Sequence, residues 1–434
     1  MASNTCSGCN LDGSNGCFNV LIGACAGKTL TSGDNNVFLG CKAGNDAADA
    51  AHNVAIGRAA GGSLTSAQYN TFIGDMAGCS HESGSYNFIG GYNAGNDQTS
   101  ANCNIKIGYS AGAKGNGSDN IMLGQKAGCK FTEGAGVFIG LSAGEHMLTG
   151  GSTIAIGNEA GKCACKSDAS IFIGRAAGKC ACDSSHGQIF IGDYAGKGNS
   201  TMADVEGDNN IAIGAYTMCD YTSAACNVVI GFYAGNDITE GLANVAIGQC
   251  AGCTITTGDY NIALGEKSLG IGAVTGNYNI SFGRCSGACV SSGENNFFAG
   301  YLAGKCVTTG YNNIYFGHSA GHGYSTSASG HNNIAMGSAA GYAICTGDHN
   351  IVMGENAGKC VAVTNRNVYL GKYTGKCQGS DGGSDNIAIG LCALIGSSTS
   401  SNNTGSNNIV IGKEAALVST SAAGNVIMGK EAAK

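Results

Sequence analysis

Apolar residues recur at a spacing of two in short stretches along the whole chain. NNIAIG begins at Asn209, NNIAMG at Asn332 and NNIVIG at Asn407, and each stretch ends at a glycine that we call the marker glycine of its unit. Counted from that glycine, an aliphatic residue stands at −3 and −1 in almost every unit, a variable residue at −2 and a small residue at +3. A spacing of two is the period of a strand and excludes the 3.6-residue period of an amphipathic helix. Each stretch therefore predicts a short β-strand.

The marker glycines repeat at a nearly constant interval from Gly23 to Gly429. There are 24 of them, and 15 of the 23 intervals are 17 residues long. The extra residues of longer intervals, as in 197–208 and 395–406, fall between position +3 and the next strand. A fixed period that fills a chain is typical of a solenoid. We expect an all-β fold: a parallel β-solenoid (β-roll) of about 24 coils with a 17-residue period over residues 17–434, after a Cys- and Gly-rich lead-in at 1–16.

The two faces of the expected strands differ in how much the residue type varies from one unit to the next. The uniform aliphatic columns at −3 and −1 are expected to face the interior, which leaves the −2 column outside. That column is apolar except at Lys106 and Ser281, and soluble proteins rarely expose so long an apolar row. We therefore predict self-association, as a trimer or a fibre, through a face that contains Phe38, Phe72, Phe138, Phe172, Phe190, Phe298, Tyr315 and Tyr369. The other hypothesis is that loop segments of the same chain cover this row.

An asparagine column accompanies the strands. Position −4 is Asn in 20 of the 24 units, and the four exceptions are consecutive. Stacked amides can hydrogen-bond along a solenoid, because each side chain supplies both donor and acceptor. The predicted ladder includes Asn19, Asn36, Asn53, Asn70, Asn210, Asn227, Asn244, Asn261, Asn333 and Asn408. Asparagine also tolerates turn conformations, and this local explanation stays open.

Several of the 23 cysteines are separated by one period. The pairs that lie 17 residues apart are Cys163 with Cys180, Cys165 with Cys182, Cys289 with Cys306, and Cys360 with Cys377. One coil step would place such pairs about 5 Å apart, within the Cα range of a disulfide. We predict inter-coil disulfides at these positions. Two other hypotheses stay open: thiols in a reducing compartment, and a zinc site at residues 163–182, although its CxC spacing is shorter than the usual CxxC.

Composition and charge exclude several functional classes. Glycine accounts for 75 residues, proline is absent, and only 12% of residues are charged. The net charge of −7 and the scattered basic residues offer no footprint for nucleic acid. No apolar run is long enough for a transmembrane helix, and the first residues lack the pattern of a secretory signal peptide. The histidines lie in varied loop positions, and no phosphate-binding motif is present. We expect no enzyme activity, no cofactor, no metal site and no membrane partner.

The repeated pattern N-x-I-x-I-G-x-x-A-G resembles repeats of two protein families over about residues 17–433. It resembles the NTAIG-type units in the shafts of phage and large-virus tail-fibre-like proteins. It is also similar to the SVAIG-type head repeats of trimeric autotransporter adhesins, which form left-handed parallel β-rolls in trimers. The resemblance implies a β-roll architecture and a place in a fibre.

These features support two functional hypotheses. The first is a structural protein that assembles with copies of itself into a virion fibre or an extracellular filament, without a Sec signal peptide. The second is an adhesive or receptor-binding β-roll whose loops at 197–208 and 395–406 contact a cell-surface or glycan ligand. An enzyme is less favoured because we find no column of acidic residues of the kind that pectin-cleaving solenoids carry.

Overall fold

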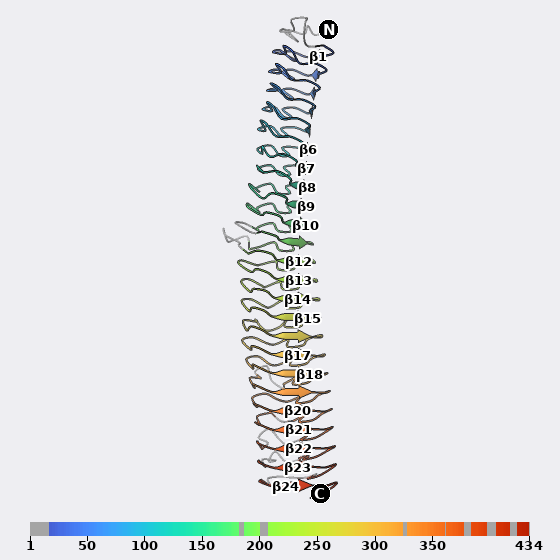
Figure 1. The fold of residues 1–434 in the computed structure, drawn as a ribbon, viewed down its shortest axis with the longest axis vertical. Helices are drawn as coiled ribbons and strands as arrows, with labels where there is room; N and C mark the ends of the chain where they lie inside the picture. Colours follow the sequence, from blue (N-terminus) through green and yellow to red (C-terminus); the bar gives the residue numbers. More distant parts are fainter. Residues whose placement is uncertain are drawn as a thin grey trace. The chain divides into compact units, whose positions relative to one another are not determined.

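The computed structural model describes residues 17–181, 186–199, 207–323, 328–360, 362–376, 383–396, 405–416 and 423–433. The chain divides into two compact units, Met1–Thr222 and Ser223–Lys434, which are described separately. Every regular element of the described ranges is a three-residue β-strand, and these ranges contain no helix. The expected all-β parallel solenoid is therefore confirmed (Figure 1).

The N-terminal unit contains twelve described strands, one per coil. They are β1 (Val20–Ile22), β2 (Val37–Leu39), β3 (Val54–Ile56), β4 (Thr71–Ile73), β5 (Phe88–Gly90), β6 (Ile105–Ile107), β7 (Ile121–Leu123), β8 (Val137–Ile139), β9 (Ile154–Ile156), β10 (Ile171–Ile173), β11 (Ile189–Ile191) and β12 (Ile211–Ile213).

The C-terminal unit also contains twelve described strands. They are β13 (Val228–Ile230), β14 (Val245–Ile247), β15 (Ile262–Leu264), β16 (Ile280–Phe282), β17 (Phe297–Ala299), β18 (Ile314–Phe316), β19 (Ile334–Met336), β20 (Ile351–Met353), β21 (Val368–Leu370), β22 (Ile387–Ile389), β23 (Ile409–Ile411) and β24 (Val426–Met428).

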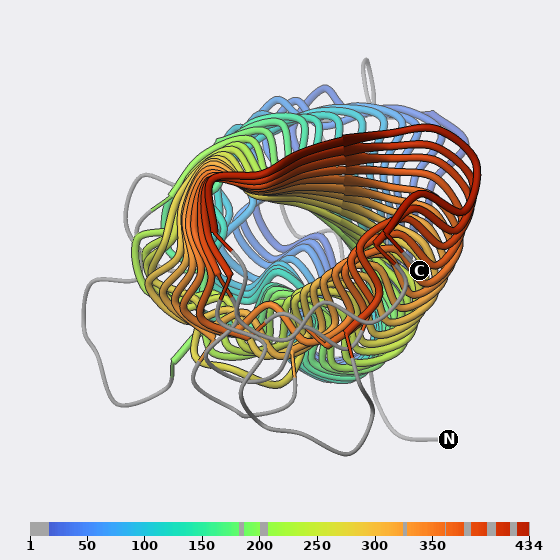
Figure 2. The same cartoon turned by 90° about the horizontal axis from the view of Figure 1, so that it is seen from below.

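Within each unit, every strand pairs in parallel with the next, and equivalent residues face each other. Val37 pairs with Val54 across a 17-residue step. Ile189 pairs with Ile211 and Ile387 pairs with Ile409 across 22-residue steps. The strand register is therefore kept across the longer intervals, as the sequence predicts. The coils of each unit overlie one another when viewed end-on (Figure 2).

Two features require glycine at the marker positions: the backbone conformation and the close approach of the next coil. Gly40 has a φ of 142°, and a Cβ at this position would lie 2.4 Å from the backbone oxygen of Gly57 in the next coil. Few L-residues adopt this φ, and no Cβ fits so close to another backbone. The coils can therefore stack at strand spacing only if the corner after each strand is glycine.

The core of each coil is filled by position −2 of the strand, the small residue at +3 and a residue at +7. In one coil a large Phe38 is buried with a small Ala47, and in the next a small Ala55 is buried with a large Leu64. In these two coils the large and the small residue exchange positions, which keeps the interior close-packed. The −2 residue can therefore differ in size between these coils.

The predicted orientation of the strands is wrong. Position −2 points into the coil, and positions −3 and −1 point outward: Tyr315 is 1% exposed, whereas its neighbours Ile314 and Phe316 are 42% and 53% exposed. The residues assigned to a self-association face are all buried in the core, namely Phe38, Phe72, Phe138, Phe172, Phe190, Phe298, Tyr315 and Tyr369.

The asparagine column gives the physical reason for this orientation. Asn53 Nδ2 donates to the backbone oxygen of Ala67 in the next coil at 2.8 Å, so the amide at −4 must turn inward. Side chains alternate along a strand, and positions −4 and −2 therefore share the inner face. Uniformity of a column thus reflects repeated neighbours along the sheet, and here it does not indicate burial.

Candidate functional site

The outer face of each sheet is the largest unpartnered feature of the described residues. We call positions −3 and −1 of the strands the outer sheet face. Ile105 and Ile107 are each 41% exposed, and Lys106 between them is fully buried. Among the outer positions of the 24 described strands, only Thr71 is polar and only Gly90 lacks a side chain. Each unit therefore presents two adjacent rows made mostly of Ile, Val and Leu, with Phe in both units and with Met and Ala299 in the C-terminal unit.

Aromatic rows extend this face on both sides. At position −5, His52, Tyr69 and Tyr86 stack with ring centroids 4.7 and 5.2 Å apart. At position +1, Tyr92 and Tyr109 stack at 5.6 Å. These side chains come from successive coils of the N-terminal unit. The apolar face is thus bordered by amphipathic rings, a composition typical of protein interfaces.

The charged side chains at position +1 are paired within the chain. Arg58 contacts Asp75 at 2.9 Å and Arg175 contacts Asp193 at 2.7 Å, in each case between adjacent coils. In the C-terminal unit, Lys372 contacts Glu355 at 2.9 Å. Exposed pairs of this kind add little stability, but they leave the border of the face with balanced charge.

The asparagine column forms a ladder of hydrogen bonds. Asn36 Nδ2 donates to Asn19 Oδ1 at 3.1 Å, and the same contact joins Asn53 to Asn36 at 3.3 Å and Asn70 to Asn53 at 3.1 Å. The backbone N–H groups of Asn244, Asn261, Asn333, Asn408 and Asn210 donate to the side-chain oxygen of residue −4 in the preceding coil, which is Gln188 in the case of Asn210. Asn227 Nδ2 donates to the Gly241 oxygen at 2.9 Å. The ladder satisfies buried polar groups, which is a structural role.

Lys106, Gln98 and His81 are polar side chains that are fully buried inside coils of the N-terminal unit, apart from the asparagine ladder. Lys106 Nζ donates to Gln98 Oε1 at 2.6 Å and to the oxygens of Gly112 and Gly115 at 3.2 Å. Desolvation lowers the pKa of Lys106 to about 7 and that of His81 to about 4. The sequence analysis did not single out His81, which is buried. Its position at +7, a column that points into the coil, could have indicated this burial. Enclosed in the coil, these groups do not face a substrate.

Most of the predicted cysteines lie in the segment after each strand. Cys163, Cys180, Cys289, Cys306 and Cys360 occupy position +6, and Cys165 occupies +8. Cys182 and Cys377 lie outside the described residues. No disulfide joins two described cysteines, so the predicted disulfides remain a prediction. Over the described ranges, no group of three or more His, Cys, Asp or Glu side chains is arranged to bind a metal ion.

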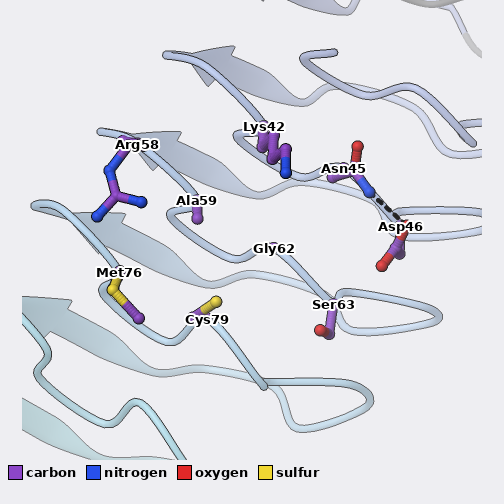
Figure 3. Close-up of a pocket in the computed structure, with 9 residues that line it drawn as sticks. All are labelled: Lys42, Asn45, Asp46, Arg58, Ala59, Gly62, Ser63, Met76 and Cys79. Atoms are coloured by element: carbon purple, nitrogen blue, oxygen red, sulfur yellow. Dashed lines mark hydrogen bonds between the residues drawn. The ribbon is translucent and has the colours of Figure 1, made fainter.

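A shallow hollow of about 300 Å³ lies beside three coils of the N-terminal unit. Figure 3 shows Lys42, Asn45, Asp46 and Arg58 around it, with Met76 and Cys79 from the next coil. Asn45 Nδ2 donates to Asp46 Oδ1 at 2.6 Å, and Arg58 is paired with Asp75. The lining combines opposite charges, of which Arg58 and Asp46 already have partners, so it does not form a cradle of a single charge.

Comparison with known proteins identifies no relative. No protein-family model, no curated protein and no solved structure matches the chain. The resemblance to fibre and adhesin repeats therefore stays a prediction. Within the described ranges there is no helix with the length and hydrophobicity of a membrane span. The loops predicted to contact a ligand, 197–208 and 395–406, lie largely outside the described residues.

Proposed function

We propose that this protein is a structural building block that associates with copies of itself, through the outer sheet face, into a trimer or fibre. The observation that supports the proposal is the pair of continuous apolar rows on each unit, exposed at positions such as Ile351, Met353, Ile387 and Ile389. Such a row in water is unfavourable, because burying apolar surface contributes about 25 cal/mol per Å².

The size of the face is sufficient for a stable interface. Twelve strands at about 4.8 Å, together with the bordering rows at −5 and +1, give each unit a face of roughly 55 by 20 Å, on the order of 1,000 Å². A standard protein interface buries about 800 Å² on each partner.

A second copy of this chain is the partner that best fits the face. The rows of side chains repeat once per strand, so only a partner with the same repeat can place its ridges between them along the whole length. The charges that border the face are already paired, as in Arg175 with Asp193, so two like copies meet without strong repulsion. A partner that relied on charge would find few unpaired groups at this border.

The proposal is tested with lysine substitutions on the face. In the double variant Ile351→Lys/Ile387→Lys, two charges would be buried in the interface, and we expect association to weaken at least tenfold. Sedimentation velocity gives the mass of the assembly, and negative-stain microscopy distinguishes discrete trimers from fibres. The matched control is Ile271→Lys/Val363→Lys, which places two charges at exposed apolar residues outside the face.

Two results would contradict the proposal. One is a wild-type protein that stays monomeric at tens of micromolar concentration. The other is a face variant that assembles as the wild type does while its circular dichroism is unchanged. Binding of the monomer to cells or glycans would favour the adhesive hypothesis instead.

A further inference from the structure

Position +6 forms a column in which side chains of successive coils lie next to each other. The backbone N–H of Cys289 donates to the oxygen of Lys305 at 2.9 Å, and that of Cys306 donates to the oxygen of His322 at 2.9 Å. A Cβ on Gly323, the next member of the column, would lie 3.1 Å from the Cβ of Cys306. Disulfides require Cβ atoms about 3.5 to 4.5 Å apart. The backbone thus brings neighbouring side chains of this column close to bonding distance.

Cys289 and Cys306 are successive members of this column, and each thiol shifts the pKa of the other. The Cys306 thiol donates a hydrogen bond to the Cys289 sulfur, which lowers the pKa of Cys289 to about 7 and raises that of Cys306. The positive charge of Lys305 also favours the Cys289 thiolate. Thiolates are the nucleophiles of disulfide exchange. Both side chains are half-buried, so a small oxidant can reach them.

Cys163 and Cys180 provide an internal comparison. They occupy the same column in the N-terminal unit, and the N–H of Cys163 donates to the oxygen of Lys179 at 2.8 Å. Here burial is the largest cause, and it raises the pKa of both thiols. The backbone geometry of the two pairs is alike, but the readiness of the thiols to react differs.

We propose that Cys289 and Cys306 are a site of oxidative modification, in which a low-molecular-weight disulfide converts the two thiols into a covalent bond between successive coils. This bond would join the coil of β16 to the coil of β17. It does not depend on self-association, so it can be correct or wrong independently of the proposed fibre.

The reaction is a two-step thiol–disulfide exchange. The Cys289 thiolate attacks one sulfur of the small disulfide, forming a mixed disulfide and releasing one thiolate. Cys306 then loses its proton and attacks the Cys289 sulfur, which releases the second thiolate. The two protein thiols are oxidised by two electrons, the small disulfide is reduced to two thiols, and the protein loses two hydrogen atoms.

The test uses the chain of 434 residues, which is reduced and then incubated with glutathione disulfide. Tryptic peptides 285–305 and 306–359 should become linked through Cys289 and Cys306, and fragmentation should assign the bond to these two residues rather than to Cys285 or Cys345. We expect the link to form at least fivefold faster than one between Cys163 and Cys180. The oxidised protein should unfold at a higher urea concentration than the reduced protein, and reduction should reverse the shift.

Serine variants make the test specific. In Cys289→Ser and in Cys306→Ser, the linked peptide and the shift in urea midpoint should both disappear, whereas Cys103→Ser, at an exposed position of another unit, should retain both. A bond between any other pair in preference to Cys289 and Cys306 overturns the proposal, as does the persistence of both thiols while glutathione disulfide oxidises other cysteines.

Discussion

Lys106 shows how one polar residue is tolerated in an otherwise apolar column. Its ammonium group has three acceptors inside the coil, Gln98 and the oxygens of Gly112 and Gly115. These contacts offset only part of the cost of removing a charge from water, so its pKa is lowered to about 7. Gln98 lies in the preceding coil. A lysine at −2 is therefore accommodated only where the preceding coil supplies such an acceptor.

Replacing Lys106 with methionine should therefore stabilise the protein and remove a pH dependence. Between pH 7 and the ordinary lysine pKa of about 10.5, the unfolded chain binds a proton that the folded chain does not. The wild type should therefore gain up to about 1.4 kcal/mol per pH unit in this window, relative to Lys106→Met. The full stabilisation from the neutral amine is present above about pH 10.5 and is lost as pH falls through 7.

Urea unfolding of both proteins from pH 6 to 10 measures this difference. Lys114→Met, which replaces an exposed lysine nearby, serves as the control and should follow the wild type. A difference between wild type and Lys106→Met that stays constant with pH would contradict a largely uncharged Lys106 in the folded state above pH 7.

At the scale of the element, each strand is held by its neighbours through the asparagine at −4. Asn296 Nδ2 donates to Asn279 Oδ1 at 3.0 Å and to the Gly310 oxygen at 2.8 Å, and its own Oδ1 accepts from Asn313 N and Nδ2 at 3.0 Å. One amide thus connects three successive coils, which three-residue strands alone join with few backbone hydrogen bonds.

Removing one amide should loosen the ladder locally. In Asn296→Ala the buried Asn313 N–H and the Gly310 oxygen lose a partner, and each such group costs about 1 to 3 kcal/mol. We expect the Asn313 amide to exchange hydrogen at least tenfold faster, measured by hydrogen–deuterium exchange at β17 and β18. Asn295→Gly is the control, because Asn295 is exposed and its φ of 55° suits glycine. Equal exchange in both variants would show that the backbone pairing alone holds the coils together.

The position and pairing of the strands could be predicted from the sequence. The side of the strand that faces the interior was predictable too, but it was predicted wrongly. The period and the in-register stacking followed from the marker glycines, because a closed coil tolerates extra residues only outside its ladder. The inward side was assigned wrongly because uniform Ile and Val columns were taken as core. The alternation of side chains along a strand could have given the correct orientation. An amide at −4 that bonds inside the coil places position −2 inside as well. The contact between Cys289 and Cys306 and the acceptors of Lys106 depend on side-chain rotamers, which spacing does not specify.

At the scale of the whole molecule, the distinguishing feature is the apolar outer sheet face of each unit, which amphipathic and charged side chains border. Only 12% of the residues are charged, and many of the exposed charges form pairs such as Glu355 with Lys372. Few unpaired charges remain on the surface, while the outer side chains of the described strands, mostly Ile, Val and Leu, are either exposed or half-buried. In the proposed assembly, burial against another copy would remove this surface from water.

The driving force of such an association determines how it responds to temperature and salt. Burial of apolar surface strengthens on warming and in sulfate, and it gives a negative heat-capacity change. We expect the assembly to tighten between about 5 and 25 °C and in ammonium sulfate, and to change little with sodium chloride, because screening acts mainly on charge pairs. Sedimentation equilibrium and dilution calorimetry measure these responses, and Ile351→Lys/Ile387→Lys should lack them. Dissociation in moderate sodium chloride would instead assign the contact to the charged rows that hold Arg58 and Asp75, since a contact between charges weakens as ionic strength rises.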